Sequence, residues 1–473
     1  MDLSRRNAIA GLMTAGIAAG TSACGKSTQS GSTETTASAH ASALPHDIPH
    51  RMNGLLLNQA AAVREMEKAG VDLVISATPK NIYYLTNQQP VPFTLGLDGM
   101  SFATLSAYGD AKPTLIESQI GYYFTTPESS QKDLINIDFY SSPADPDVYG
   151  KILNARDLAD APAAPGLMPR RHNSHELSSL EAYRRSVSEK EATELTASIE
   201  AAILKQILDN PLKNKTIAID HSKLRPIIEK SGLDVKIVDA ENLIRRFRIE
   251  KTPMEIDLMR YAAAANASAG NACAKAARDG ASFAEIRREF SKECATRALS
   301  PVFMMIDTII PHFTHGEIID GRTFLIDCVS EFEGYHGDYG RTVCVGEPKR
   351  EIKAVIDTLS TTWDRIRSEL RPGMTFYDLF GRSAELFKES NVDAGFAINP
   401  HTIGLNHSDE PMGGSFGQYR KENITLVENM VLSIDMPVLD SGLGGTAHLE
   451  DLVLITKDGA ELLNQSDDRF ITV

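Results

Sequence analysis

The feature that most restricts the fold of this chain is a set of four segments in its C-terminal half that combine apolar runs with acidic or histidine side chains. They are residues 324–342, 401–407, 430–437 and 448–455. An ionised carboxylate in an apolar strand is costly to bury without a partner, so these side chains need cations beside them. The pattern predicts strands that gather acids and imidazoles around positive charge.

The donor atoms of these segments favour hard divalent metals. We expect a strand ending in Asp327, a glycine-bearing turn and a returning strand from Asp338, which would set two carboxylates side by side. Asp435, Glu450 and His401 come from the other segments. Such a set suits Mn²⁺, Zn²⁺, Co²⁺ or Fe²⁺. Two ions about 3.5–4 Å apart can activate a water and hold a developing oxyanion.

Each of these residues also has a plainer interpretation when taken alone. Asp327 could cap a turn, Asp338 could pair with Arg341, and His401 could be a hydrogen-bonded core histidine. Asp451 is interpreted as a surface or supporting residue. The metal hypothesis therefore depends on the order and context of the residues together.

A domain boundary is predicted near residue 250, where Thr252-Pro253-Met254-Glu255 forms a capping box with proline in the first helical turn. We expect one α/β (α+β) domain over residues 49–248 and a second over 249–473. In the first, a helix over 60–69 should end at Gly70. A long helical region is expected over 177–209, and strands over 71–77, 82–86, 114–117, 216–220 and 234–238.

Residues 1–24 resemble a twin-arginine export signal. Arg5 and Arg6 precede an apolar run that, as a helix, spans only about 20 Å of a hydrocarbon core of about 30 Å. Residues 25–48 read as a disordered tether. We expect a periplasmic protein, anchored through a lipid on Cys24. Cleavage by ordinary signal peptidase, or a cytosolic protein with a chance arginine pair, are the alternatives.

Charge and cysteine content exclude other classes of protein. A net charge of −15 argues against a nucleic-acid partner, which needs clustered Lys and Arg. The five cysteines form no CxxC pair, so a sulfur-ligated metal is not expected. Cys328 and Cys344 flank the predicted hairpin, which leaves a disulfide between them as a less favoured possibility.

The joint order of motifs resembles the creatinase/aminopeptidase P/prolidase family. Asp327 precedes Asp338-x-x-Arg-Thr, followed by His401-x-x-Gly-Leu, Ile-Asp435-x-Pro and Leu-Glu450-Asp-x-Val. The resemblance covers roughly residues 50–473. It implies a creatinase-type N-terminal domain followed by a pita-bread metallopeptidase domain, and a homodimer.

The resemblance also implies two divalent ions, with Mn²⁺ favoured. It implies metal ligands at Asp327, Asp338, His401, Asp435 and Glu450. Asp338 and Glu450 would bridge the ions, and His401 and Asp435 would complete the shell of the second. The implied activity is Xaa-Pro aminopeptidase or dipeptidase cleavage of a small peptide.

Two histidines are implied on the substrate side. His407 would contact the tetrahedral intermediate, and an upstream histidine, His315 or His312, would assist it.

Several positions depart from the family pattern. Asp435 stands where glutamate is usual, His448 stands where an arginine is usual, and Ala397 replaces a common second histidine. His401 and His407 are six residues apart where seven is common. These departures leave room for a different enzyme on the same fold, a C–N hydrolase or a lyase of a small molecule, and for a non-catalytic binding protein.

Overall fold

The computed structural model describes residues 54–473, apart from 90–92, 94, 98, 110–111, 126–132, 168–174, 309–314, 391, 393–397, 414–419 and 440–441. The predicted export signal, the tether, Cys24, His312 and Ala397 lie outside the described residues. Within the described part, no helix is long and apolar enough to cross a membrane.

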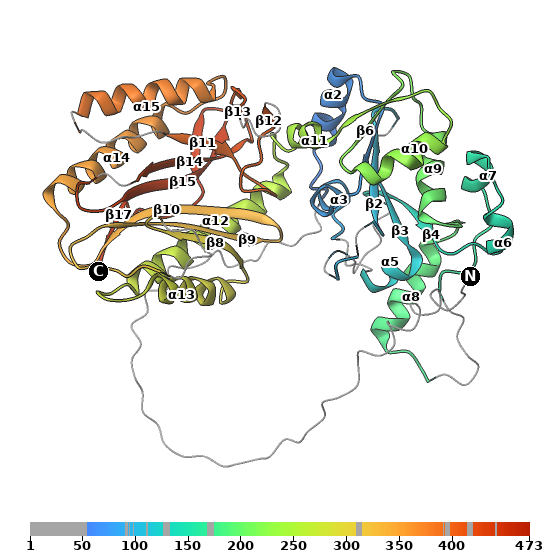
Figure 1. Cartoon of the computed structure of the whole chain (residues 1–473), viewed down its shortest axis with the longest axis horizontal. Coiled ribbons are helices and arrows are strands. Elements are labelled where there is room, and N and C mark those ends of the chain that lie inside the picture. Colours follow the sequence, from blue (N-terminus) through green and yellow to red (C-terminus); the bar gives the residue numbers. More distant parts are fainter. Residues whose placement is uncertain are drawn as a thin grey trace, which may run out of the picture. The chain divides into compact units, whose positions relative to one another are not determined.

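The first half of the described chain forms a mixed seven-stranded sheet in the order β5-β4-β3-β2-β1-β6-β7 (Figure 1). Its strands are β1 Leu73–Ser76, β2 Phe102–Ser106, β3 Thr114–Ser118, β4 Asn136–Tyr140, β5 Leu195–Thr196, β6 Thr216–Ile219 and β7 Lys236–Asp239. Its helices are α2 Gln59–Ala69, α3 Pro79–Thr86, α5 Gln119–Thr125, α6 Pro146–Tyr149, α7 Ala155–Ala159, α8 Ser179–Glu191, α9 Ile199–Asp209, α10 Arg225–Lys230 and α11 Glu241–Phe247.

Local signals explain where these elements begin and end, and where two expectations were wrong. Helix α2 ends at Gly70, whose φ of 65° suits glycine, as predicted. Residues 82–86 are helical rather than extended, because Pro79 starts α3 and every residue of that run is buried, which hides the helical period. Residues 177–209 form two helices, not one, because Ser198 caps a new helix after β5.

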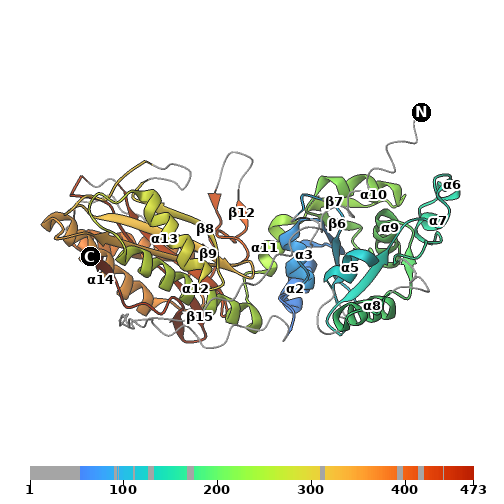
Figure 2. The ribbon, with the colours of Figure 1, turned by 90° about the horizontal axis from the view of Figure 1, so that it is seen from below.

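The second half of the chain forms an eight-stranded sheet with the main order β11-β14-β15-β10-β9-β8. Its strands are β8 Ser300–Ile306, β9 Phe324–Phe332, β10 Tyr335–Cys344, β11 Asn399–Thr402, β14 Val431–Val438, β15 Ala447–Thr456, β16 Gly459–Leu462 and β17 Phe470–Thr472. A separate ribbon pairs β12 Met412–Gly413 with β13 Arg420–Lys421. The helices are α12 Pro253–Lys275, α13 Phe283–Ala295, α14 Arg350–Glu369 and α15 Phe376–Ser390 (Figure 2). The predicted capping box at Thr252 begins α12.

The helices of this domain leave one face of the sheet to the polar side chains. Helix α12 packs against β10 at Gly337, where an added Cβ would overlap the Ala262 carbonyl oxygen. Successive residues of a strand point to opposite faces, so Asp338 points away from that helix. On β15, Leu449 packs in the same core as α14, so Glu450 points to the opposite face of the sheet, on which Asp338 also lies. The mixed sheet of the first domain is thus followed by a second domain built on the eight-stranded sheet, as the expected fold class requires.

The hairpin at the first acidic segment differs from the expectation. Strand β9 does not end at Asp327 but continues to Phe332. The chain turns at Glu333 and Gly334, whose φ values of 53° and 81° suit a tight hairpin turn. Cys328 lies opposite Tyr339 and Cys344 lies past the other end of that ladder. Both thiols are free, as are the other cysteines that the structure describes.

Candidate metal centre

Sheet register gathers three carboxylates into one row across four strands. Asp327 of β9 lies opposite Gly340 of β10, which lies opposite Glu450 of β15, which lies opposite Asp435 of β14. Paired residues on neighbouring strands point to the same face. Gly340, which lies between Asp327 and Glu450 in this row, has no side chain, and the His448 ring occupies the space over it.

A second row, one side-chain step along the sheet, brings in the fourth carboxylate and the first imidazole. Asp338 lies opposite Val329 on β9, and His401 lies opposite Ser433 on β14. His401 Nε2 is 3.6 Å from Asp338 Oδ2 and 3.8 Å from Glu450 Oε1. The Ser433 hydroxyl donates to Glu450 Oε1 over 2.6 Å, which fixes one end of that carboxylate. The five predicted ligands therefore line one face of the sheet.

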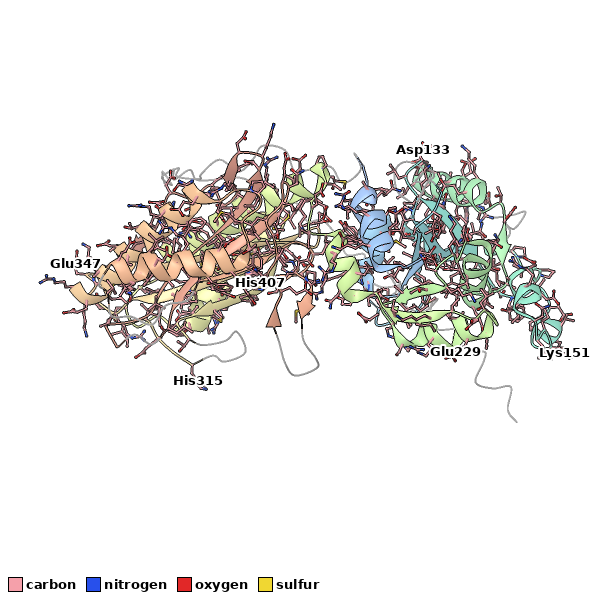
Figure 3. All side chains as sticks on the ribbon, turned by 90° about the horizontal axis from the view of Figure 1, so that it is seen from above. Asp133, Lys151, Glu229, His315, Glu347 and His407 are labelled. Atoms are coloured by element: carbon pink, nitrogen blue, oxygen red, sulfur yellow. The ribbon has the colours of Figure 1, made fainter. Side chains whose placement is uncertain are left out.

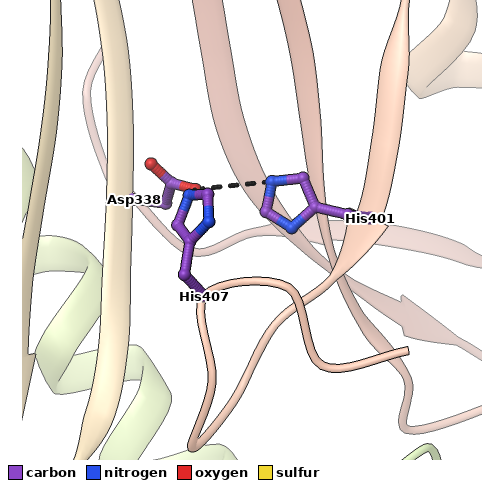
Figure 4. A group of neighbouring side chains, drawn as sticks. All are labelled: Asp338, His401 and His407. Carbon is purple, nitrogen blue, oxygen red and sulfur yellow. Dashed lines mark ion pairs between the residues drawn. The ribbon is translucent and has the colours of Figure 1, made fainter. Parts of the chain in front are cut away.

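His407 joins the cluster from the loop that follows β11. Its Nε2 is 3.1 Å from Asp338 Oδ2, and its ring lies 4.7 Å from the His401 ring (Figure 4). Phe303 packs edge-to-face against the His407 ring, with the ring centroids 5.2 Å apart. The His407 side chain keeps 33% of its surface exposed, whereas Asp338 is fully buried. His407 is thus a residue of the cluster that solvent can reach.

Buried charges hold the His407 loop in place. Asp409, two residues after His407, accepts hydrogen bonds from Arg248 at 2.8 and 3.1 Å and lies 3.7 Å from Lys251 Nζ. All three side chains are 1% exposed. Asn406 is held from outside the loop, because Lys80 Nζ donates to its side-chain oxygen over 3.0 Å. These contacts anchor a loop that is one residue shorter than the family pattern.

Among the residues that the structure describes, the donor atoms form three overlapping groups, within each of which all atoms lie within 4.8 Å of one another. The groups are Asp338, His401 and His407; Asp327, Asp338 and Glu450; and Asp435, His448 and Glu450. His401 and Asp435, expected on one ion, fall into different groups. Asp338 and Glu450 each belong to two groups, which is the position of a bridging ligand.

The electrostatics of the cluster fit divalent cations. Among the described residues, both Asp338 carboxylate oxygens, Asp327 Oδ1 and Glu450 Oε2 are buried and accept no hydrogen bond. Burial and the neighbouring carboxylates raise the pKa values of Asp338 and Glu450 well above their usual range. Burial also raises the pKa of Asp327 to about 6. Buried carboxylate oxygens that lack hydrogen-bond donors favour the binding of a positive ion between them.

Sequence reasoning noted His448 only as a departure and missed that its ring enters this cluster. Its Nε2 lies 2.7 Å from Asp435 Oδ1 and 3.6 Å from Glu450 Oε2. Burial opposes protonation of the imidazole, but the hydrogen bond and charge of Asp435 raise the His448 pKa to about 9. The available signal was strand parity, since His448 and Glu450 are two apart on β15 and share a face.

Two other expected residues lie elsewhere. His315 is exposed, and Figure 3 shows it at the periphery of the domain, away from His407. Within the described residues, it belongs to none of the three donor groups. Asp451 is not a surface residue: it is fully buried and binds Arg341 at 2.7 Å. Arg341 therefore pairs with Asp451 and not with Asp338.

Comparison with known proteins identifies similar sequences. Residues 257–457 match the model of metallopeptidase family M24. The probable dipeptidase PepE of Mycobacterium bovis is 26% identical over 253 residues, covering 51% of this chain and 65% of that protein. The Xaa-Pro dipeptidase of Pyrococcus furiosus is 28% identical over 274 residues, covering 54% of this chain and 76% of that protein. The chain thus matches slightly less than two thirds of the mycobacterial relative.

Solved structures extend the similarity to both domains. The prolidase from Pyrococcus horikoshii OT3 has a TM-score of 0.58 at 16% identity, covering 86% of this chain and 98% of that chain. The Xaa-Pro dipeptidase from Bacillus anthracis has a TM-score of 0.60 at 15% identity, covering 88% and 100%. At these identities the likeness concerns the fold, namely a mixed α/β domain followed by a pita-bread half-barrel.

Proposed function

We propose that this chain is a member of metallopeptidase family M24 and that its candidate metal centre hydrolyses Xaa-Pro peptides as a dipeptidase or aminopeptidase. The observation that carries the proposal is the buried carboxylate cluster, which lies beside three imidazoles and in which four carboxylate oxygens of Asp327, Asp338 and Glu450 lack hydrogen-bond donors. The substrate class is inferred from the Xaa-Pro dipeptidase of Pyrococcus furiosus and the probable dipeptidase of Mycobacterium bovis.

Two divalent ions, with Mn²⁺ favoured, fit the donor set better than one. Asp327, Asp338 and Glu450, which form one donor group, would hold the first ion. The family resemblance implies Asp338, Glu450, His401 and Asp435 for the second ion, although His401 and Asp435 belong to different donor groups. Membership of two donor groups supports the bridging roles of Asp338 and Glu450. When bound, the ions would neutralise these acids and supply the Lewis acidity that amide hydrolysis requires.

The chain's own residues divide the remaining tasks. His407 is the more exposed of the two histidines around Asp338, so its imidazole is placed to hydrogen-bond the reacting carbonyl group of a substrate. Phe303 packs against its ring and limits the directions in which that ring turns. Asp409 and its two cationic partners keep the loop fixed, which preserves the distance between His407 and Asp338.

Asp338→Asn tests the proposal directly. The substitution removes a bridging charge, so we expect metal content and Xaa-Pro cleavage to fall together, the latter by about 1,000-fold or more. Metal per chain is measured by mass spectrometry of purified protein, and turnover on a panel of Xaa-Pro dipeptides and longer peptides. Asp234→Asn, at a 97% exposed side chain, serves as the matched control and should change neither.

The metal and turnover measurements distinguish a peptidase from a small-molecule enzyme and from a binding protein on the same fold. Full metal content in Asp338→Asn would contradict the bridging role. Metal binding with turnover of small amides, and not of proline peptides, would assign a small-molecule enzyme. Metal binding without turnover on either panel would assign a binding protein.

A further inference from the structure

The histidine at position 448 occupies space that a missing side chain provides. Gly340 lies in the middle of the carboxylate row, between Asp327 and Glu450. A Cβ added at Gly340 would overlap Cε1 and Nδ1 of the His448 ring. The ring therefore lies over the glycine, inside the row of acids, and any other residue at position 340 would displace it.

The contacts of His448 are those of a donor within the metal centre. The residue is 2% exposed, and its Nε2 lies 2.7 Å from Asp435 Oδ1 and 3.6 Å from Glu450 Oε2. Glu450 Oε2 is buried and accepts no hydrogen bond, and His448 Nδ1 is buried without a partner. The Glu450 oxygen that lacks a donor therefore lies 3.6 Å from His448 Nε2, while His448 Nδ1 is directed towards Gly340.

These separations match donors that share one ion. Two atoms each about 2.1 Å from a metal lie about 3.0 Å apart at a right angle and about 3.4 Å apart at a tetrahedral angle. The measured 2.7 and 3.6 Å fall on either side of these values. Asp435, one methylene shorter than the usual glutamate, also has its second oxygen 3.2 Å from the Asn399 amide. The Asp435 carboxylate therefore extends less far towards the donor group that contains His401.

We propose that His448, through Nε2, is a ligand of the metal ion held by Asp435 and Glu450, and that Gly340 is present to admit its ring. The proposal rests on the proposed metal centre and adds an imidazole to it. The imidazole nitrogen of His448 would supply a ligand atom where the shorter Asp435 side chain extends less far. Gly340, Asp435 and His448 therefore form one coordinated change in the site. An imidazole ligand also softens the donor set and raises its affinity for Zn²⁺ and Co²⁺ relative to Mn²⁺.

The direct test is a crystal of the full chain loaded with Co²⁺, with the ions located by anomalous scattering. We expect His448 Nε2 within about 2.0–2.2 Å of an ion that Glu450 also binds. A cobalt site more than 3 Å from Nε2, with the Asp435 hydrogen bond kept, would overturn the proposal and leave the metal centre standing. Absence of cobalt from the whole cluster would overturn the metal centre as well.

Solution measurements test the same idea in variants. His448→Gln should retain one fewer Co²⁺ per chain after dialysis and lose part of the imidazole signal in X-ray absorption spectra. His336→Gln is the matched control, because His336 is a buried histidine of the same domain that binds the Gly404 carbonyl and belongs to no donor group. Equal cobalt content and an equal imidazole signal in His448→Gln and wild type would refute the assignment.

Gly340→Ala displaces the ring while leaving every donor side chain in the sequence. We expect it to lose the same ion as His448→Gln. Gly381→Ala, at a helical glycine with open space around it, is its control and should bind cobalt like wild type. A Gly340→Ala protein that is folded by circular dichroism and fully loaded with cobalt would contradict the role of Gly340.

Discussion

At the scale of single residues, the short side chain of Asp435 determines which residues it contacts in the site. Asp435 carries an acid one methylene shorter than the family pattern, and its two oxygens are engaged by His448 and Asn399. Those hydrogen bonds and the charge of His448 lower its pKa, although burial acts in the opposite direction. A carboxylate with two fitted partners indicates a pocket rebuilt around aspartate rather than one that has decayed.

Asp435→Glu distinguishes a rebuilt pocket from a degenerate one. The extra methylene must enter space already filled by the His448 ring, and overpacking a fitted site costs about 1–3 kcal/mol. We expect weaker metal binding and lower turnover on the same peptide panel. A clear gain in Xaa-Pro cleavage by the glutamate variant would contradict the rebuilt pocket.

Motif order could predict the principal donors but not the pairing among them. Asp327, Asp338 and Glu450 interrupt apolar strands, where a buried carboxylate needs a counter-charge. The sequence therefore predicts that these three acids meet at one site. The grouping of Asp435 with His448 instead of His401 depends on a glycine on a neighbouring strand, which no linear motif displays. Cross-strand register therefore supplied the information that the sequence lacked.

At the scale of elements, a buried ionic contact holds the loop after β11. Asp409 lies between Arg248 and Lys251, and these cations lower its pKa despite full burial. The two cations come from the segment between α11 and α12. The contact therefore connects the loop that carries His407 to a distant part of the chain.

Asp409→Asn should destabilise the protein by about 3–5 kcal/mol, because it leaves two buried cations without their anion. Guanidinium denaturation of wild type and variant measures the difference in the free energy of unfolding. Asp257→Asn provides a surface comparison, since its pair with Arg260 is 65% and 40% exposed and should contribute less than about 1 kcal/mol. Equal losses in the two variants would contradict the anchoring role.

Glu255, at the start of α12, should make stability depend on pH. Burial, opposed by Lys251, raises its pKa from 4.5 to about 7. The folded state therefore holds this proton more tightly than the unfolded state, so the stabilising contribution is complete below pH 4.5 and is lost as pH rises through 7. Glu255→Gln keeps the capping box and removes the titration.

Relative to Glu255→Gln, wild type should lose on the order of 3 kcal/mol of unfolding free energy between pH 4.5 and pH 8. Urea denaturation of both proteins at several pH values measures this difference. Parallel pH profiles of the two proteins would show that Glu255 does not titrate in this range.

Element prediction succeeded where a local signal fixes an end and failed where burial is uniform. Gly70 and the Thr252 capping box mark their helix ends by chemistry that acts within a few residues. Helix α3 was not predicted because its residues 81–86 are all buried, so that burial does not alternate with the helical period. The split of residues 177–209 required the short strand β5, whose two residues carry little signal of their own.

At the scale of the whole molecule, we propose that the chain is exported to the periplasm already folded and with its metals bound. The basis is the Arg5-Arg6 pair and the short apolar run, with Cys24 as a lipid attachment point. Replacing both arginines with lysine should leave unprocessed precursor in the cytoplasm, as followed by fractionation and immunoblotting. Undisturbed processing would instead indicate general secretion or no export.

The most direct measurement of the two-metal centre is anomalous diffraction from crystals of the full chain grown with Mn²⁺. The proposed site predicts two manganese peaks per chain, each about 2.0–2.3 Å from carboxylate oxygens of Asp338 and Glu450. Peaks that lie elsewhere in the molecule, or a cluster without anomalous signal at saturating Mn²⁺, would contradict it.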